Sequence, residues 1–487
     1  MAIAVTILVI AAILVRIPFL DSLTPDSRDF VKPWLDHLTA NGLSALGAPL
    51  PSPVYGLQGN YTPPYYYLLW LVSPLNGIIP GIWLIKAITF LFEGFAAYLA
   101  FRLIEQRASR WVSLAGAAAV LLAPTVIANG AWWGQCDVIW ASLILASFYA
   151  TTKQRPLSAI VFFGVALAFK AQSIFFGPYL FLLFLRDEIK LWHFAAIPIV
   201  YAAAMAPAVA LGRSWIEAFT IYAEQGAFFH KLSLNAPNLY YFMPSAFYEI
   251  GTKVGLILTA IACAGLAVFP RATKVELDPA LRILAATMFV ALAPFLLPKM
   301  HDRYFFAADL FSIILAFYAP RFWAVPVVFQ ISSIAAYVPQ ITKSLFGEEK
   351  PTTLPLAVML ATLTVIFLVS EYYRACTRKD RQLGEASHLY VTAALAILAA
   401  VLTWIVAAAA RQVVSAKICP QGGPLGRAIC DGEMPLNLSN ASLSQWALFF
   451  AILAISYPIA NLTVRYIRNQ IWPHAKSMLP SKQSPMA

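Results

Sequence analysis

The chain has 487 residues, of which 60% are hydrophobic and only 12% are charged, and its formal net charge is +11. Soluble domains carry about 25% charged residues, so this composition excludes a soluble enzyme, a disordered chain and a disulfide scaffold. The mean hydropathy of +0.72 predicts an integral membrane protein with many spans. Topology explains the basic charge better than nucleic acid does, because the sequence contains no basic-aromatic motif for nucleic-acid binding.

Apolar segments recur along the whole chain, and we predict an all-α polytopic fold with about 14 transmembrane helices. The first segment lacks a basic leader and a small-residue cleavage site, so we expect it to be retained as a helix. The predicted spans are 2–20, 81–102, 112–129, 138–151, 156–169, 173–186, 192–212, 252–269, 282–298, 304–319, 322–339, 352–371, 388–410 and 443–464.

Lys and Arg are concentrated in alternate loops, including the basic cluster at 374–381 and the C-terminal tail. The positive-inside rule therefore places both termini in the cytoplasm. The segment 61–75 is apolar and aromatic but short, with Pro near both ends. We predict that it is an interfacial helix of the first outer loop, with its aromatic rings at the level of the lipid headgroups.

With this topology, all the polar segments that interrupt the apolar sequence fall on the outer face, which predicts one extracytoplasmic site. They are Asp21–Asp36, Trp132–Asp137, Lys170–Gln172, His230–Asn238 and Lys299–Arg303.

The first two of these segments carry carboxylates. Asp26 follows Pro25 and lies near Arg28, so it could accept a proton from a sugar hydroxyl or simply cap a helix. Trp133 and Asp137 belong to a turn that could form a sugar platform, or an interfacial Trp belt with a helix-capping Asp.

The other segments carry cations. Lys170 could pair with a lipid phosphate or extend to the interface as a solvated side chain. Lys299, His301 and Arg303 could neutralise a phosphate leaving group, or they could form a structural ion-pair cluster with Asp302.

Glu93 lies inside a predicted span, with Lys86 seven residues earlier on the same helical face. An intramembrane carboxylate indicates either function or an internal ion pair. These two residues are the best evidence for an alternative function, a transporter or flippase of lipid-linked sugars. A transporter places its polar groups near the bilayer midplane, whereas here most of them gather on one face.

The cysteines indicate no metal centre, because there is no CxxC and no Cys/His cluster. Cys419 and Cys430 share the last outer loop and are candidates for a disulfide in an oxidising compartment. Cys136, Cys263 and Cys376 are expected to be free thiols.

Six motifs follow one another in order, and together they resemble bacterial Gpi18-like mannosyltransferases of the GT-C glycosyltransferase superfamily. The motifs are D-x-R-x-F-x-x-P-W at 26–34, N-Y-T-P-P-Y at 60–65, W-W-G-Q-x-D at 132–137, F-K-x-Q at 169–172, N-x-P-N-L-Y at 235–240 and M-H-[ED]-R-Y-F at 300–305. Residues 320–487 carry none of these motifs.

The resemblance implies an inverting transferase with a polyprenyl-phosphate sugar donor, in which Asp26 is the catalytic base. The family's M-H-E-R-Y carries the shorter Asp302 here, which argues against a direct catalytic role at that position. The implied donor phosphate-binding residues are Lys299, His301, Arg303, Lys170 and Arg28. The implied sugar- and acceptor-binding residues are Trp133, Gln135, Asp137, Gln172, Asn238 and Tyr61. No cofactor is expected, and a divalent metal at Asp26 and Asp29 is not favoured.

The complete expectation is a GT-C-like catalytic module at 1–319, whose first outer loop is 21–80, followed by C-terminal helices at 320–487 with an outer loop at 411–442. It would lie in a bacterial inner membrane with a periplasmic active site. It would transfer a sugar, with mannose as the first candidate, to a hydroxyl of a glycan, lipid or protein acceptor.

Overall fold

The computed structural model describes residues 1–52, 59, 61–243, 247–346 and 351–377. Residues 1–377 form one compact unit. The predicted spans 388–410 and 443–464, the loop 411–442 and the proposed Cys419–Cys430 disulfide lie outside the described residues.

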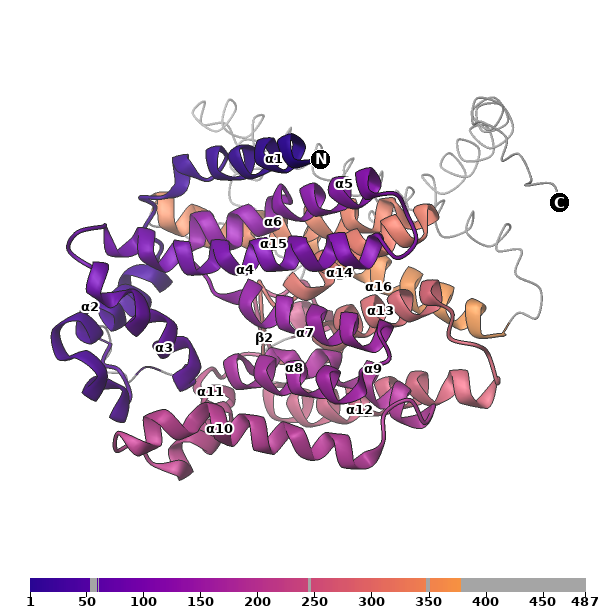
Figure 1. Cartoon of the computed structure of the whole chain (residues 1–487). Coiled ribbons are helices and arrows are strands. Elements are labelled where there is room, and N and C mark those ends of the chain that lie inside the picture. The colour runs from indigo at the N-terminus through magenta and orange to yellow at the C-terminus, as the bar shows by residue number, and fades with distance from the viewer. Residues whose placement is uncertain (53–58, 60, 244–246, 347–350, 378–487) are drawn as a thin grey trace, which may run out of the picture. The chain divides into compact units, whose positions relative to one another are not determined.

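The described part is built almost entirely of helices (Figure 1), which confirms the all-α prediction. The α-helices are α1 Ala2–Leu14, α2 Lys32–Asn41, α3 Pro63–Val72, α4 Gly81–Ile104, α5 Arg110–Leu121, α6 Pro124–Val126, α7 Asp137–Thr152, α8 Pro156–Phe169, α9 Gly177–Leu185, α10 Ala196–Ala210, α11 Trp215–Phe228, α12 Tyr248–Ala272, α13 Pro279–Leu296, α14 Phe306–Tyr318, α15 Ala324–Phe346 and α16 Leu354–Thr377. The shorter elements used below are η1 Ile17–Phe19, η2 Ser27–Val31, η5 Ile127–Trp133, η6 Ala171–Phe176, η8 Leu239–Phe242, β1 Ser233–Leu234 and β2 Met300–His301.

Each span predicted within residues 1–377 coincides with an apolar helix. Among the described residues, 7 helices are long and apolar enough to cross a membrane, and α5 with α6 and η5 forms a further span bent by 42°. The remaining predicted spans correspond to the shorter apolar helices α7, α8, η6 with α9, and α14. The chain is therefore a multi-pass membrane protein, although the predicted total of fourteen includes the two segments beyond the described part.

The centre of the unit is formed by α7, α13 and α14, whose side chains are buried on nearly all sides. By contrast, α1 and much of α12 expose apolar side chains, as helices facing lipid do. Helix α15 packs against α14, and α16 packs against α13. The compact unit therefore extends to Thr377 and includes these two helices, while the end of the catalytic module at residue 319 stays a prediction.

The loop 21–80, which the sequence predicts to be the first outer loop, contains η2, α2 and α3, and α3 coincides with the predicted interfacial segment. The expectation that the aromatic rings of this segment lie among lipid headgroups is wrong for Tyr65 and Tyr66, which are 1% and 0% exposed. The ring of Tyr66 packs edge-on against the ring of Trp34, and the Tyr67 hydroxyl donates to the Ala204 carbonyl of α10 at 3.0 Å. Pairing of these rings and hydroxyls inside the protein fixes the loop over the helices.

Candidate active site

Two segments that are distant in sequence from Asp26 converge on its carboxylate. The indole nitrogen of Trp133 donates to its Oδ2 at 3.1 Å, and the Gln135 side-chain amide donates at 2.6 Å. An Arg303 guanidinium nitrogen lies 3.6 Å from the same oxygen. The Asp26 side chain is 34% exposed, so a substrate hydroxyl can still reach it.

The backbone before α7 explains how Trp133 and Gln135 reach one carboxylate. The π-helical turn η5 ends at Trp133 and is followed by Gly134, whose φ of 73° lies in the left-handed region. Glycine adopts this conformation without a steric penalty. The chain therefore reverses sharply at residue 134, and the side chains before and after it both bind Asp26.

The second carboxylate, Asp137, is fully buried and already bound by the protein. Its Oδ1 accepts from the Lys170 amine at 2.5 Å, and its Oδ2 accepts from the Asn129 amide at 2.9 Å. Burial opposes the charge of Lys170, but the nearby Asp137 outweighs it and raises the pKa of the Lys170 amine above its ordinary value. Asp137 is thus placed as the counter-charge of Lys170.

Arg303 lies among three carboxylates, with nitrogen–oxygen distances of 3.6 Å to Asp26, 3.5 Å to Asp137 and 3.5 Å to Asp302. Its guanidinium also lies 5.3 Å from the ring centroid of Trp133. Burial opposes the Arg303 charge, but these carboxylates hold the pKa of Arg303 well above its ordinary value. Burial also raises the pKa of Asp302 to about 7.

Segment 299–304 is held in place by a short parallel pairing of β1 with β2. The amide of Lys299 donates to the Leu232 carbonyl at 2.6 Å, and the amide of Asp302 donates to the Leu234 carbonyl at 3.0 Å. Together with the bridge between Asn235 and His301, these bonds place the start of the N-x-P-N-L-Y motif beside the M-H-D-R-Y-F motif. The segment directs Arg303 toward Asp26, whereas Lys299 and His301 line a cavity.

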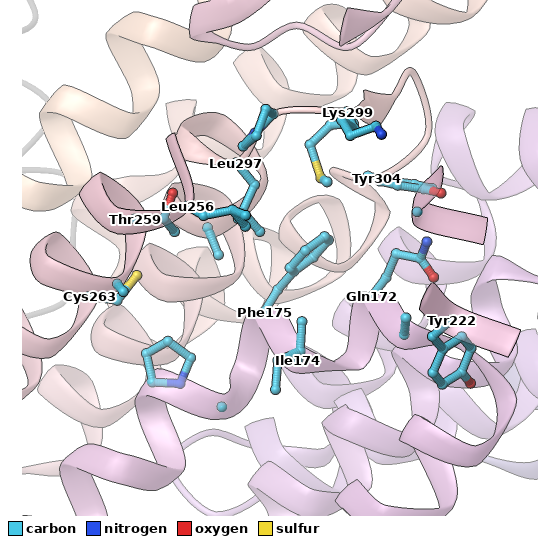
Figure 2. Close-up of a pocket in the computed structure, with 18 of the residues that line it drawn as sticks. Gln172, Ile174, Phe175, Tyr222, Leu256, Thr259, Cys263, Leu297, Lys299 and Tyr304 are labelled. Carbon is cyan, nitrogen blue, oxygen red and sulfur yellow. The ribbon is translucent and has the colours of Figure 1, made fainter. Parts of the chain in front are cut away.

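This cavity has a volume of about 950 Å³ and is lined mainly by apolar side chains of η6, α9, α12 and α13. Figure 2 shows Gln172, Lys299 and Tyr304 gathered toward one end, with Thr259 and Cys263 of α12 toward the other. The cavity combines a long apolar wall with one polar end.

The polar end carries one cation and a neutral imidazole. Burial, reinforced by Arg303 and Lys170, holds the pKa of His301 well below its ordinary value. The lowered pKa favours the neutral form of the His301 ring, which can then serve as a hydrogen-bonding group at this end of the cavity. The Lys299 amine bonds to the Tyr248 hydroxyl and lies 4.9 Å from the centroid of that ring.

The structure connects most of the predicted site residues. Asp26, Trp133, Gln135, Asp137, Lys170 and Arg303 form one contiguous cluster, called the carboxylate cluster below. Tyr61 belongs to its edge, because its hydroxyl donates to Gln135 at 3.4 Å and its ring lies 5.4 Å from the Lys170 amine. Gln172, Lys299 and His301 line the adjacent cavity.

Two predicted residues lie elsewhere. Arg28 is 63% exposed and bonds to its neighbour Asp29 at 2.6 Å. Asn238 is buried, its amide donates to the Leu297 carbonyl at 3.0 Å, and its oxygen accepts from the Tyr240 amide at 3.2 Å. Asn238 thus caps η8 and stabilises the turn of its own motif.

Sequence reasoning missed Tyr337, whose ring packs edge-on against Trp133 with centroids 5.4 Å apart. Tyr337 belongs to α15, in the part of the chain without a recognised motif. A single Tyr in an apolar helix carries no signal that would distinguish it from an ordinary core residue.

The intramembrane charges Glu93 and Lys86 do not pair with each other. Glu93 forms a buried ion pair of 2.8 Å with Arg16, at the end of α1. Lys86 is bound by backbone carbonyls at the start of the first outer loop. Both groups therefore contribute to internal packing, which removes the best evidence for the transporter alternative.

Among the residues that the structure describes, no group of three or more His, Cys, Asp or Glu side chains is arranged to hold a metal ion. Cys136, Cys263 and Cys376 are buried free thiols, as predicted.

These features define a membrane enzyme that places a carboxylate beside a cavity with a cationic end, and comparison with known proteins assigns its class. The model for glycosyltransferase family 87 matches residues 60–298, a range that contains four of the six motifs in full. The chain is a multi-pass membrane glycosyltransferase, as its motifs predicted. The narrower resemblance to Gpi18-like mannosyltransferases stays a prediction.

Among solved structures, the chain is similar to ArnT from Cupriavidus metallidurans. The structure of ArnT bound to undecaprenyl phosphate matches with a TM-score of 0.48 and 14% identity, covering 98% of this chain and 81% of that one. The apo structure matches with a TM-score of 0.47, 14% identity and the same coverage. No curated protein gives a significant match.

Proposed function

We propose that this glycosyltransferase moves a sugar from a polyprenyl-phosphate donor to an acceptor hydroxyl, with inversion at the anomeric carbon. One observation carries the proposal: segment 299–304 joins the carboxylate cluster to the apolar cavity. A proton acceptor and a binding place for a lipid anion are thereby brought to opposite sides of one short segment.

The cavity suits the donor. Its apolar wall would receive the lipid chain, while the Lys299 charge and the His301 ring N–H would bind the phosphate at the polar end. Lys170 and Arg303 already neutralise carboxylates, so we assign them to organising the cluster and balancing its charge as the phosphate departs. The proposed phosphate-binding residues are therefore Lys299 and His301, which are fewer than the motif resemblance implied.

The reaction follows from the position of Asp26. The acceptor O–H bond breaks and its proton moves to the Asp26 carboxylate, while the oxygen attacks the anomeric carbon from the face opposite the phosphate. The new glycosidic C–O bond forms as the carbon–oxygen bond to the phosphate breaks, and the lipid phosphate keeps that electron pair. A single displacement of this kind inverts the configuration, and Gln135 and Trp133 hold Asp26 in its orientation.

The finer assignments are also part of the proposal. The distribution of Lys and Arg supports cytoplasmic termini and a site on the extracytoplasmic face of a bacterial inner membrane. The motif resemblance favours mannose as the sugar, and a glycan, lipid or protein would supply the hydroxyl. We propose that no metal or other cofactor takes part, since Asp26 alone can accept the proton.

The test uses purified protein in detergent or lipid nanodiscs with a synthetic polyprenyl-phosphate sugar, candidate acceptors and measurement of released lipid phosphate. General-base catalysis contributes about 100-fold or more, so Asp26→Asn is expected to reduce kcat by at least that factor. The variant must elute and unfold like the wild type. Wild-type turnover in a well-folded Asp26→Asn protein would remove Asp26 as the base, and donor translocation without bond cleavage would contradict the transferase assignment.

A further inference from the structure

Lys86, in the second turn of α4, is completely buried and has no part in the reaction as described above. Its amine donates to the backbone carbonyls of Phe19 at 2.6 Å, Leu20 at 3.0 Å and Ser22 at 2.8 Å, and it lies 2.9 Å from the Ser22 hydroxyl. These acceptors follow α1 at the point where the first outer loop begins. The ammonium therefore fixes the start of the loop that carries Asp26.

The same junction reaches the turn that binds Asp26. The Ser22 hydroxyl donates to the Trp132 carbonyl at 2.6 Å, and the Thr24 hydroxyl donates to the Trp133 carbonyl at 3.0 Å. A Cβ added at Gly134 would lie 3.7 Å from Cε of Lys86. The side chain of Lys86 thus passes beneath the reversal at Gly134 while its amine binds the loop.

A buried ammonium is costly unless hydrogen bonds replace its lost hydration. Here, three carbonyls and a hydroxyl do so, which accounts for its presence in an apolar helix. An apolar side chain could fill the same volume without that cost. It could not, however, tie the loop carbonyls to α4.

We propose that Lys86 is a positioning residue for the transfer reaction: it holds the Asp26 loop against the η5 turn, so that Trp133 and Gln135 donate to Asp26. The catalytic part of this inference rests on the proposed function, whereas the positioning itself does not. A misplacement of about 1 Å can cost a reaction about 100-fold in rate, so the junction matters for catalysis without touching the substrate.

The experiment compares the wild type, Lys86→Met and Ser22→Ala by hydrogen–deuterium exchange of peptides covering 19–31 and 127–136. In parallel, kcat and KM are measured with the synthetic polyprenyl-phosphate sugar. Glu371→Gln is the matched control, because Glu371 is 2% exposed and forms a 2.9 Å pair with Arg374 in α16, away from this junction. Ser22→Ala leaves the buried charge in place and serves if Lys86→Met does not fold.

We expect exchange to rise in both peptides in Lys86→Met and, to a smaller degree, in Ser22→Ala, but not in the control. We expect kcat to fall about 10- to 100-fold while KM for the donor stays constant, because the cavity is untouched. Unchanged exchange in both peptides, in whichever variant folds, would overturn the positioning role. Raised exchange with unchanged kcat would overturn its importance for the reaction. Absence of wild-type turnover would instead count against the proposed function. The exchange measurements would then still decide whether Lys86 holds the Asp26 loop in place.

Discussion

The carboxylate cluster and the apolar cavity share segment 299–304, but the cations of the cluster are paired with carboxylates whereas the cation of the cavity is not. In the cluster, Lys170 pairs with Asp137 and Arg303 lies among three carboxylates, so the charges largely neutralise one another. In the cavity, Lys299 contacts the Tyr248 hydroxyl and ring, and within the described part of the chain it has no carboxylate partner. A cationic end on an apolar cavity suits an anionic lipid, whereas a neutralised cluster suits proton transfer and orientation.

Among the substitutions, one at Arg303 is expected to have the largest effect, because Arg303 is the cation that three carboxylates of the cluster share. Arg303→Met leaves Asp26, Asp137 and Asp302 without their shared cation, and breaking a buried ion pair in this way typically costs about 3–5 kcal/mol. We expect a marked loss of thermal stability in detergent and a fall in kcat of about 100-fold. Arg303→Lys should recover part of the stability only, because an amine cannot reach three carboxylates at once. A stable, active Arg303→Met protein would contradict the description of the cluster.

Filling the cavity should affect donor binding alone. Ala260 lines the cavity, whereas its neighbour Ile261 is 66% exposed on another face of α12. We expect Ala260→Trp to raise KM for the polyprenyl-phosphate donor about 10-fold, equivalent to about 1.4 kcal/mol of lost binding, with little change in stability. Ile261→Trp adds the same side chain outside the cavity and should leave KM unchanged. Equal KM values for both variants would remove the cavity as the donor site.

The pH dependence of stability should report on Asp302. Burial raises the pKa of this carboxyl in the folded protein to about 7, so the folded state keeps a proton that the unfolded chain releases near pH 4. Between these values the folded state binds more protons, and this contribution to stability falls as pH rises from about 4 to 7. Asp302→Asn should lose less stability across this window than the wild type when unfolding temperatures are compared. Parallel curves for the two proteins would contradict the raised pKa.

Arg28 should give the smallest effect, although the sequence places it beside the catalytic loop. It is exposed and pairs with Asp29, and exposed pairs contribute about 0.2–1 kcal/mol. We expect Arg28→Ala to change the unfolding temperature and the donor KM only slightly, as measured in the same assays. A rise of about 10-fold or more in the donor KM would return Arg28 to the phosphate site.

Much of this protein was predictable because the bilayer restricts what an apolar segment can be. A lipid-exposed segment has to satisfy its own backbone hydrogen bonds, so each predicted span within residues 1–377 is found as a helix. The motifs also identified the residues of both regions, because charged and amide side chains beside apolar segments are conspicuous. The helical first segment and the polar character of the segments between the apolar helices required no tertiary information.

Which side chains contact each other was decided only by the tertiary structure. Glu93 pairs with Arg16 rather than with Lys86, and Tyr337 reaches Trp133 from a helix about 200 residues later in the sequence. Pairings of this kind depend on how helices pack and on where turns such as Gly134 redirect the chain, and local hydropathy and spacing contain neither. For the same reason, the sequence predicted Lys170, Lys299 and Arg303 as one group of phosphate-binding cations. In the folded chain, Lys170 and Arg303 pair with carboxylates, and Lys299 lines the cavity.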